Sequence, residues 1–503
     1  MTPTSLISLC EPRETRGRLP ERLGELRQDS RRVVEGDVFI AVRGTQVDGH
    51  AFAGQAVDLG ASVLICEHEP EGFRMPEEHG EENTTCLLLV DDTRRLLGPL
   101  AQAFHGHPAR ELKVVAVTGT NGKTTVATLA WQVLHRLGVA ASLLGTVAKK
   151  IGAEELDTRL TTADPIELAA DMRRMVDAGS THLVMEVSSH ALDQQRTGGI
   201  DFEVGAFTNL SHDHLDYHKD MSAYAGAKKK LFDAMKSGTA AVINADDAWG
   251  DFMCQDTPAR VIRFSYEGAG GVDCRILHGG SNGLTLKVGG QQVESPLLGP
   301  FNAYNVAQAF LICREFGFPE RRIAQALADA PGAPGRLERV AGSGEQERPL
   351  VLVDYAHTPD ALENVLSTLA AMKNNDQELH VIFGCGGDRD TDKRPRMADV
   401  AETLADRVTV TSDNPRSEDP EAIIDDIMEG FSHPDRVTRL ADRRRAIRQA
   451  VLQADGRQII LIAGKGHETY QEIQGRRLDF DDRRVARDAL MQRNGNPETE
   501  EVA

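Results

Sequence analysis

The sequence predicts an α/β fold in three domains, on two observations. Short apolar runs alternate with helical patterns from Val114 onward, as in a mainly parallel sheet that helices cover. Two clusters of glycine and proline, at residues 104–110 and 329–335, interrupt this alternation and are typical of linkers. A chain of 503 residues has room for about three domains of roughly 150 residues each. We therefore expect domains over residues 1–108, 109–334 and 335–503.

Each predicted domain contains apolar runs of strand length. In the first domain the runs at 36–42 and 61–66 flank a helical stretch over 51–59, which predicts a small α/β unit. In the second domain strands are expected at 113–117, 183–187, 204–207 and 240–243. In the third domain they are expected at 350–353, 379–383, 407–410 and 459–462. The last series again indicates a doubly wound sheet.

An apolar strand of the second domain runs directly into a glycine-rich turn, at residues 113–125 with the sequence KVVAVTGTNGKTT. Backbone N–H groups in such a turn point at phosphate oxygens, and the N-terminus of the following helix adds positive charge. Lys123 can neutralise phosphate charge, and Thr124 can hold Mg²⁺. The first glycine of the general pattern G-x-x-x-x-G-K-[ST] would fall at Val117, so the match is incomplete. The segment still predicts a site for ATP or GTP.

The composition argues against several classes of protein. A formal net charge of −20 without a basic run argues against nucleic acid as a partner. Seven cysteines, widely spaced and without C-x-x-C, favour reduced thiols over a disulfide framework. The N-terminus lacks a signal-peptide pattern, and no apolar run approaches the roughly 18 residues that span a bilayer. We expect a cytoplasmic protein without membrane insertion.

Polar residues follow the predicted strands, and the carboxyl ends of parallel strands are where such sheets bind ligands. Glu186 closes an apolar strand, where a carboxylate is costly to bury without a cation or a hydrogen-bond donor. A carboxylate and an imidazole close to Thr124 would suit Mg²⁺. A single histidine is as often a cap or a core residue. The choice therefore stays open among His190, His212, His214 and His218.

In this order, the motifs resemble those of the Mur ligase family of ATP-dependent, amide-forming enzymes. The resemblance extends over nearly the whole chain. It rests on residues 118–125, 186–190, 209–218, 224–228, 302–305, 335–336, 354–357 and 413–416. Within the family, the tetrapeptide Asp413-Asn414-Pro415-Arg416 is similar to the one that marks the branch adding diaminopimelate.

The resemblance implies a function. It implies a ligase that adds meso-2,6-diaminopimelate to UDP-N-acetylmuramoyl-L-alanyl-D-glutamate in peptidoglycan precursor synthesis. The D-glutamyl carboxylate would attack ATP to give an acyl phosphate and ADP, and the amine would then displace phosphate. The N-terminal domain would bind the uridine nucleotide, the central P-loop domain ATP, and the C-terminal Rossmann-like domain the amino acid. Because these sites lie on different domains, we also expect hinge closure.

The same resemblance implies roles for residues around ATP. The catalytic residues would be Lys123, Glu186, His214 and Lys228. Mg²⁺ would be held by Thr124, Glu186, His214 and Lys228, the last as a carbamate formed with CO₂. Lys228 lies in a run of three lysines whose simplest interpretation is a solvated helix face, so only the resemblance singles it out. The ATP-binding residues would be Thr118, Gly119, Thr120, Asn121, Gly122, Lys123, Thr124, Thr125, Asn302, Asn305, Arg336 and Asp354, with His357 as a weaker addition.

Two further sets are implied for the other substrates. Around the UDP-linked peptide they are Gln28, Ser30, Thr45, Gln46, Val47, Thr161, Thr162, Ser188, Gln194 and Arg196. Around diaminopimelate they are Arg389, Asp413, Asn414, Pro415, Arg416, Gly464 and Glu468. The second carboxylate of diaminopimelate, which lysine lacks, suits bidentate pairing with Arg416, while Glu468 or Asp413 receives an ammonium.

Two alternatives stay open. One is a ligase of the same fold that adds another amino acid or acts as a folate-polyglutamate-type ligase; residues 413–416 weigh against it. The other is a P-loop switch or scaffold protein whose nucleotide state controls partner binding; it leaves the polar strand ends of the third domain unexplained. For partners we expect the three small-molecule substrates, no nucleic acid and a monomer.

Overall fold

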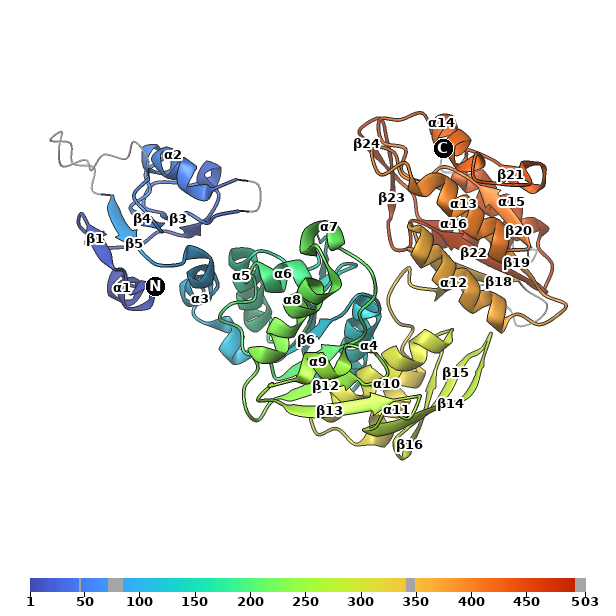
Figure 1. Ribbon diagram of the computed structural model, residues 1–503, viewed down its shortest axis with the longest axis horizontal. Coiled ribbons are helices and arrows are strands. Elements are labelled where there is room, and N and C mark those ends of the chain that lie inside the picture. The colour runs from blue at the N-terminus through green and yellow to red at the C-terminus, as the bar shows by residue number, and fades with distance from the viewer. Residues whose placement is uncertain (45–46, 71–84, 159, 341–348, 494–503) are drawn as a thin grey trace. The chain divides into compact units, whose positions relative to one another are not determined.

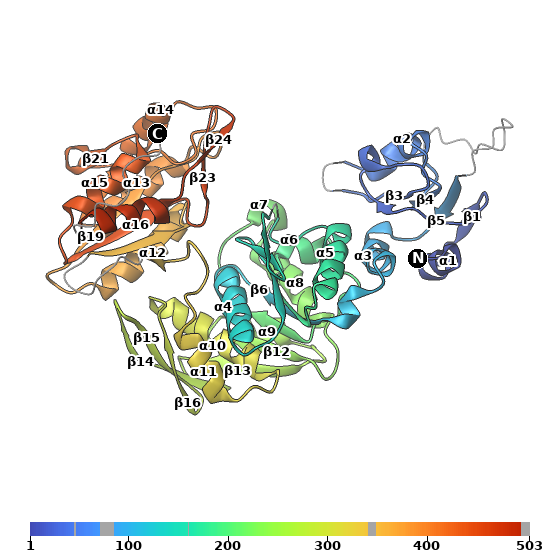
Figure 2. The same ribbon diagram turned by 180° about the vertical axis from the view of Figure 1, so that it is seen from behind.

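The computed structural model describes residues 1–44, 47–70, 85–158, 160–340 and 349–493. The chain divides into two compact units, Met1–Asp273 with Ala307–Ile323, and Cys274–Val306 with Ala324–Ala503. Figures 1 and 2 show the helices and strands of each unit from opposite sides. Within the described ranges, no helix is long and apolar enough to cross a membrane.

The N-terminal part of the first unit is a small sheet in the order β1-β5-β4-β3-β2, with β1 antiparallel to β5 and the other pairs parallel. The apolar runs predicted at 36–42 and 61–66 are its inner strands β3 and β4, whose residues are all buried. The elements are α1 (Pro3–Cys10), β1 (Glu14–Arg16), β2 (Leu26–Arg27), β3 (Val38–Ile40), α2 (Ala53–Asp58), β4 (Val63–Cys66), β5 (Cys86–Leu89) and α3 (Thr93–Phe104).

The central part of the chain contains a parallel sheet in the order β13-β12-β11-β6-β10-β7, which the antiparallel strands β8 and β9 extend beyond β7. Its strands are β6 (Lys113–Thr118), β7 (Ala141–Leu144), β8 (Lys149–Ile151), β9 (Glu154–Leu156), β10 (His182–Glu186), β11 (Val204–Phe207), β12 (Ala240–Asn244) and β13 (Arg260–Ser265). Its helices are α4 (Lys123–Arg136), α5 (Pro165–Asp177), α6 (Ser189–Asp193), α7 (Leu215–His218), α8 (Met221–Asp233) and α9 (Gly250–Cys254).

Helices cover both faces of this sheet. Val114 and Ala116 of β6 belong to one buried cluster together with residues of α5, α6 and α8. Val115 and Val117 alternate with them along the strand and therefore face the other side, where α4 packs on β6 and β10. Figure 2 shows α4 and α8 on opposite faces of the sheet. This arrangement confirms the α/β fold with a mainly parallel central sheet.

Antiparallel strands that the sequence did not reveal follow the parallel sheet. They are β14 (Val272–Gly280), β15 (Gly283–Val288) and β16 (Gln291–Ser295), and α10 (Pro300–Arg314) and α11 (Glu320–Ala328) come after them. Buried and exposed residues are interspersed along these strands. A strand with one solvated face lacks the continuous apolar run on which the prediction relied, so the sequence analysis did not identify these strands.

The C-terminal part of the second unit is a second α/β sheet in the order β17-β18-β22-β19-β20-β21. The helices α12, α13 and α14 pack on one face, and α15 and α16 pack on the other. The elements are β17 (Glu338–Arg339), β18 (Leu350–Asp354), α12 (Pro359–Met372), β19 (Glu378–Phe383), α13 (Lys393–Leu404), β20 (Arg407–Val410), α14 (Pro420–Met428), β21 (Thr438–Arg439), α15 (Arg443–Gln453), β22 (Gln458–Ala463), β23 (Tyr470–Ile473), β24 (Arg476–Asp479) and α16 (Asp482–Arg493).

A fully buried ion pair joins α15 and α16 beneath this sheet. The side chains of Arg443 and Asp482 are both 0% exposed, and their two hydrogen bonds measure 2.8 and 2.7 Å. Arg443 Nη2 also donates to the carbonyl oxygen of Ala463, the last residue of β22, at 2.9 Å. The pair therefore connects two helices to the strand end that precedes Gly464.

Removing one member of this pair leaves the other charge buried without a partner. We expect Arg443→Met to lower the local stability of β22 and α16 by about 3 to 5 kcal/mol. Hydrogen exchange of peptides from residues 458–493 measures this loss. The matched control is Arg457→Met, which removes an arginine from a surface pair with Asp455 and should change exchange far less. Equal effects of the two variants would contradict the prediction.

Candidate active site

The carboxyl ends of β6, β10 and β11 carry the predicted nucleotide-binding residues. β6 ends at Thr118 and α4 begins at Lys123, so strand, glycine-rich turn and helix follow in the predicted order. Gly119 has φ +150°, and a Cβ atom there would come within 1.8 Å of Thr208 Oγ1, so only glycine fits. Gly122, at φ +84°, leads the chain into the helix. The N-terminus of α4 thus lies at the edge of the sheet where β6 ends.

The glycine-rich turn is tied to the end of β11. The backbone N atoms of Thr120 and Asn121 donate to the O and Oδ1 atoms of Asn209, at 2.8 and 2.9 Å. Thr208 Oγ1 donates to the carbonyl oxygen of Asn121 at 2.6 Å. The Nζ atom of Lys123 donates to two carbonyl oxygens of the turn itself, at 3.0 and 2.7 Å. The turn and its lysine are therefore held in place by the protein's own groups.

Glu186, the last residue of β10, is almost completely buried at 1% exposed. Its Oε2 atom accepts hydrogen bonds from Thr124 Oγ1 at 2.9 Å and from Thr146 Oγ1 at 3.2 Å. Its Oε1 atom accepts one from the backbone N of Thr146 at 2.7 Å. The partners that a buried carboxylate requires are thus neutral donors. They place Glu186 directly against the first turn of α4.

Thr146 is a residue that the sequence analysis missed. It follows β7 by two positions, and its Oγ1 also lies 3.0 Å from Thr161 Oγ1, so it links Glu186 to the loop before α5. The preceding Gly145 leaves room for the carboxylate, because a Cβ atom there would lie 2.4 Å from Glu186 Oε1. The sequence analysis did not predict a strand at 141–144, so it did not consider the residues that follow that strand. With the strand predicted, Thr146 would have been a candidate site residue.

Lys228, in α8, is buried at 1% exposed and faces the nucleotide turn. Its Nζ atom donates to the carbonyl oxygen of Gly119 at 2.7 Å and lies 4.5 Å from the ring centroid of Tyr224. Burial lowers the pKa of Lys228 well below its ordinary value. The other two lysines of the run, Lys229 and Lys230, form ion pairs with aspartates. Lys228 therefore does not lie on a solvated face of the helix.

Three of the four candidate histidines lie together. The ring centroid of His190 is 4.9 Å from that of His214 and 5.4 Å from that of His218. His214 is partly exposed and lies 6.1 Å from the ring of Tyr224. Burial lowers the pKa values of His190 and His218, so both favour the neutral imidazole. His212 is exposed and does not take part in these ring contacts.

The residues expected around the muramoyl peptide form one hydrogen-bonded group with Glu186. Thr162 Oγ1 donates to the carbonyl oxygen of Glu186 at 3.0 Å and accepts from the backbone N of Ser188 at 3.1 Å. Arg196 Nη1 donates to the carbonyl oxygen of Thr162 at 3.0 Å. Arg196 Nε and Nη2 donate to Gln194 Oε1, at 3.0 and 2.7 Å. Segments far apart in sequence therefore meet at the end of β10.

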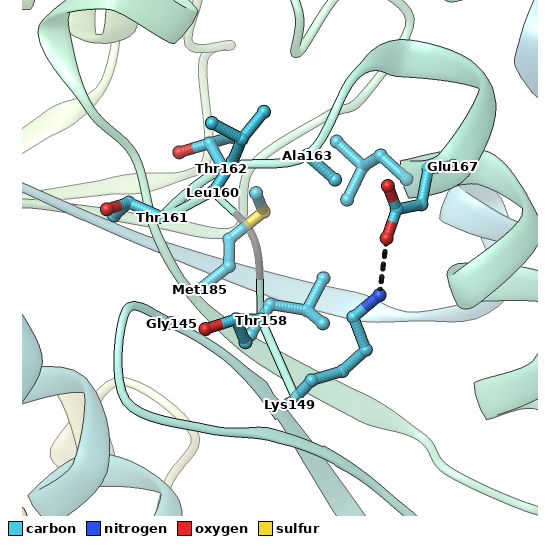
Figure 3. Close-up of a pocket in the computed structure, with 11 residues that line it drawn as sticks. Gly145, Lys149, Thr158, Leu160, Thr161, Thr162, Ala163, Glu167 and Met185 are labelled. Carbon is cyan, nitrogen blue, oxygen red and sulfur yellow. Dashed lines mark hydrogen bonds and ion pairs between the residues drawn. The ribbon is translucent and has the colours of Figure 1, made fainter. Parts of the chain in front are cut away.

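A small cavity of about 20 Å³ lies beside the predicted peptide-binding threonines. Figure 3 shows Thr161 and Thr162 on one side of it, with Lys149 and Glu167 on the other. Lys149 Nζ lies 2.8 Å from Glu167 Oε1. A space of this size holds about one water molecule, so it is not a binding site for a peptide.

The residues expected around the uridine nucleotide lie in the N-terminal sheet. Ser30 is buried, and its Oγ donates to Gln55 Oε1 at 2.7 Å. Gln28 is half-buried, and Val47 is 56% exposed. Thr45 and Gln46 are outside the described residues. The structure thus places Gln28, Ser30 and Val47 in this part of the first unit, away from the hydrogen bonds around Glu186.

The second unit carries the remaining residues assigned to ATP. Asp354 ends β18, and its two carboxylate oxygens accept from the backbone N atoms of Ala356 and Leu337, at 2.8 and 2.7 Å. Burial raises the pKa of Asp354, and the nearby Arg336 opposes this effect. The guanidinium of Arg336 lies over the ring of Tyr355, 5.0 Å from its centroid. A flat cationic and aromatic surface therefore adjoins the end of β18.

Asn302 and Asn305 lie in α10 and are both buried. Asn305 Nδ2 donates to Asn302 Oδ1 at 2.8 Å, and Asn302 Nδ2 donates to the carbonyl oxygen of Leu298 at 2.7 Å. These bonds fix the orientation of both amides within the second unit.

The residues expected around diaminopimelate gather at the ends of β20 and β22. Asn414 Nδ2 donates to Glu468 Oε2 at 2.8 Å. Gly464 has φ +115°, and a Cβ atom there would lie 2.5 Å from Asp413 Oδ2, so glycine is required beside this carboxylate. Lys465, which the sequence analysis did not single out, is fully buried between Asn414 and Glu468.

Arg416 follows this group in an unusual backbone conformation, with φ +52°. Its Nη1 donates to the carbonyl oxygen of Gly387 at 2.7 Å, and its Nε lies 3.6 Å from Glu472 Oε2. The side chain is 25% exposed. Arg389 lies in the loop that contains Gly387 and is exposed.

The donors around Glu186 fit Mg²⁺ that arrives with a nucleotide. Thr124 and Glu186 offer hard oxygen ligands beside the glycine-rich turn. Among the described residues, no group of three or more His, Cys, Asp or Glu side chains could hold a metal ion. In nucleotide sites Mg²⁺ needs only one or two carboxylates together with phosphate oxygens and waters. The donor set therefore suits this ion and does not suit a metal held by protein alone.

Comparison with known proteins agrees with this arrangement. Three family models match: the Mur ligase family catalytic domain over residues 24–105, the Mur ligase middle domain over 117–313 and the Mur ligase glutamate ligase domain over 335–466. The UDP-N-acetylmuramoyl-L-alanyl-D-glutamate–2,6-diaminopimelate ligase of Parabacteroides distasonis is 41% identical over 92% of this chain and 93% of its own. The ligase of that name from Synechococcus elongatus is 43% identical, over 93% and 94%.

Solved structures show the same relationship. A UDP-N-acetylmuramoyl-L-alanyl-D-glutamate–2,6-diaminopimelate ligase matches with a TM-score of 0.68 at 35% identity, over 93% of this chain and 95% of that one. Mycobacterium tuberculosis folylpolyglutamate synthase shares the fold, with a TM-score of 0.54 at 21% identity over 81% and 96%. The identity to relatives over nearly the whole chain and the three matching family models lead to one conclusion. This chain belongs to the Mur ligase family.

Proposed function

We propose that this protein is the ATP-dependent ligase that joins meso-2,6-diaminopimelate to the D-glutamyl carboxylate of UDP-N-acetylmuramoyl-L-alanyl-D-glutamate. The observation that carries this proposal is an identity above 40% over more than nine-tenths of the chain to ligases named for this reaction. ATP is the energy source, and ADP and phosphate are released. The glycine-rich turn, Glu186 and the residues at the ends of β20 and β22 supply the chemistry that such a reaction requires.

The nucleotide turn and α4 bind the phosphates. The N-terminus of α4 and the glycine-rich loop before it offer backbone N–H donors and positive partial charge to phosphate oxygens. Lys123 Nζ moves from the turn's carbonyl oxygens to the phosphate, where it offsets charge as the substrate carboxylate approaches. Asn302, Asn305, Arg336 and Asp354 are assigned to the adenosine part of ATP.

Thr124 and Glu186 are the residues that would hold Mg²⁺, with His214 as a further ligand. When bound, this ion would supply positive charge that stabilises the transferred phosphoryl group. Thr146 keeps the Glu186 carboxylate in place through its N–H and hydroxyl. The hydrogen bond from Thr124 Oγ1 to Glu186 Oε2 keeps these two oxygen ligands next to each other, where they would hold the ion.

The substrate carboxylate attacks the γ-phosphorus of ATP and releases ADP, which forms an acyl phosphate. The amine of diaminopimelate then adds to the acyl carbon, and phosphate leaves with the bonding electrons as the amide forms. Arg196 bonds Thr162 and Gln194 with three of its N–H groups and keeps others for the anionic peptide. Thr161 and Ser188 line the same edge.

Lys228 is proposed to react with CO₂ to give a carbamate, with loss of one proton. CO₂ adds only to a neutral amine, and Lys228 is buried 2.7 Å from Gly119 O with a pKa well below its ordinary value. The product would place an anion, which could ligate Mg²⁺, where the neutral amine had been. Burial next to the nucleotide turn supports this role over that of a surface lysine.

Arg416, Asp413, Asn414 and Glu468 are assigned to diaminopimelate, with Arg389, Pro415 and Gly464 beside them. A guanidinium pairs with the side-chain carboxylate that distinguishes this amino acid from lysine, and the acidic groups receive an ammonium. The position of Arg416 in the loop that follows β20 supports this assignment.

The proposal also assigns a substrate to each of the three predicted domains. Residues 1–108 bind the uridine nucleotide through Gln28, Ser30, Thr45, Gln46 and Val47. Residues 109–334 bind ATP together with Arg336 and Asp354, and residues 335–503 bind the amino acid. The reaction takes place in the cytoplasm and is carried out by a monomer.

The release of phosphate from ATP tests the proposed ligase function. With ATP, Mg²⁺ and the UDP-linked dipeptide, we expect release to require meso-diaminopimelate and to be much slower with L-lysine or without amino acid. Preference for lysine would retain the ligase chemistry and overturn the substrate. Release that ignores both acceptor and amino acid would favour a nucleotide switch.

Replacing Arg416 should reduce the discrimination between the two amino acids. We expect Arg416→Ala to reduce the ratio of kcat/KM for diaminopimelate to kcat/KM for lysine. The expected reduction is equivalent to about 2 to 5 kcal/mol, because the substrate carboxylate loses its paired cation. Competition between the two amino acids measures the ratio. The control Arg436→Ala removes an exposed arginine from the same unit and should leave the ratio unchanged; an unchanged ratio in both variants would refute the role of Arg416.

The carbamate predicts chemical rescue. Lys228→Ala should lose most activity because it lacks the anion beside the nucleotide turn. Added formate or acetate should restore part of that activity, whereas chloride at equal ionic strength should not. Phosphate release at several carboxylate concentrations measures the effect, and Lys229→Ala is the control in the same helix. Full activity of Lys228→Ala, or the same gain with chloride, would contradict the carbamate.

A further inference from the structure

Lys465 is a fully buried lysine within the group of residues assigned to the amino acid. It follows the end of β22 by two positions and is 0% exposed. Its Nζ atom donates to Asn414 Oδ1 at 3.0 Å and to Glu468 Oε2 at 2.9 Å. The same atom lies 5.4 Å from the ring centroid of Tyr470. The ammonium thus has an anion, an amide oxygen and an aromatic face around it.

A cation without access to water is stable only when it is paired and hydrogen-bonded. Glu468 supplies the opposite charge, and Asn414 and Tyr470 supply further favourable contacts. These partners hold the charged end of Lys465 in one place. A long side chain that had only turned away from solvent would not have such a set of contacts.

The contacts of Asn414 fix the orientation of its amide. Its Oδ1 accepts from Lys465 Nζ and also from the backbone N of Glu472 at 2.9 Å. A cation and a backbone N–H both need an acceptor, so exchange of the oxygen and nitrogen positions would lose both bonds. Its Nδ2 donates one hydrogen to Glu468 Oε2 at 2.8 Å. Among the residues that the structure describes, the second hydrogen of Nδ2 has no identified acceptor.

Glu468 is held through one of its two oxygens. Its Oε2 accepts from both Lys465 and Asn414, whereas within the described chain no hydrogen bond to Oε1 is recorded. The side chain remains 19% exposed. An amide N–H and a carboxylate oxygen, held by the same buried lysine, thus form a donor and acceptor pair that suits the carboxylate and ammonium of an amino acid.

We propose that Lys465 is a positioning residue for the amino acid substrate. It does not touch the substrate; it locks the amide of Asn414, anchors Glu468 through Oε2 and neutralises part of the carboxylate's charge. This inference rests on the proposed function, because Asn414 and Glu468 are assigned there to diaminopimelate. The amino acid is then selected by a pair of groups whose orientation a third, buried residue determines.

The test replaces the charge with a side chain of similar length. In Lys465→Met, the Asn414 amide loses one of the two donors that hold its Oδ1, and Glu468 loses its buried cation. We expect the KM for diaminopimelate to rise at least about tenfold, as for the loss of hydrogen bonds to a charged group. The kcat at saturating diaminopimelate and the KM values for ATP and the UDP-linked dipeptide should remain close to those of the wild type.

Two further variants make the result specific. Lys465→Gln keeps an N–H donor and should show a smaller rise in the KM for diaminopimelate. Circular dichroism shows whether each variant folds, and Lys465→Gln provides the test if Lys465→Met does not fold. In a Glu468→Gln background, Lys465→Met should raise the KM by a smaller factor, because the lysine acts partly through that carboxylate. Lys373→Met, which removes a lysine that pairs with Asp406 near the surface, is the control.

The outcomes separate the inference from the proposed function. A selective rise in the KM for diaminopimelate, reduced in the Glu468→Gln background, supports the inference. A fall in kcat with an unchanged KM for diaminopimelate, in whichever variants fold, overturns it and leaves Lys465 a structural role. A wild-type enzyme that releases phosphate without any need for diaminopimelate overturns the proposed function itself.

Discussion

Glu186 imposes the constraint on which the central site depends, because the fold removes its carboxylate almost completely from water. A buried carboxylate must be hydrogen-bonded, and the donors come from Thr124 at the start of α4 and Thr146 after β7. Its carbonyl oxygen accepts from Thr162, which belongs to the loop before α5. The hydrogen bonds of Glu186 thus hold the nucleotide turn and the predicted peptide-binding loop at the same edge of the sheet.

The second unit satisfies the same requirement in a different way. Glu468 is paired with a buried lysine, Lys465, and with the amide of Asn414. At Glu186 the hydrogen-bond donors are neutral threonine groups. At Glu468 a lysine cation donates to one carboxylate oxygen. The two carboxylates, which we propose for metal binding and for amino-acid binding, therefore lie in different electrostatic settings.

Much of the fold and part of the site could be predicted from the sequence. The parallel strands were found because each is a continuous apolar run, and the nucleotide turn because its glycines have no substitute at their backbone angles and contacts. Strands with one solvated face, such as β14 and β15, carry no such signal. Thr146 and Lys465 were missed for a related reason: their importance lies in contacts with Glu186, Asn414 and Glu468 that no local pattern records.

The sequence by itself determined the α/β class, the position of the nucleotide turn and the family, because these depend on short segments whose pattern is local. Tertiary structure alone decided that Lys228 is buried while its neighbours Lys229 and Lys230 pair with aspartates. It also decided which donors hold each buried carboxylate. Burial and charge pairing depend on residues brought together from distant parts of the chain, and a linear pattern contains the residue types but not their contacts.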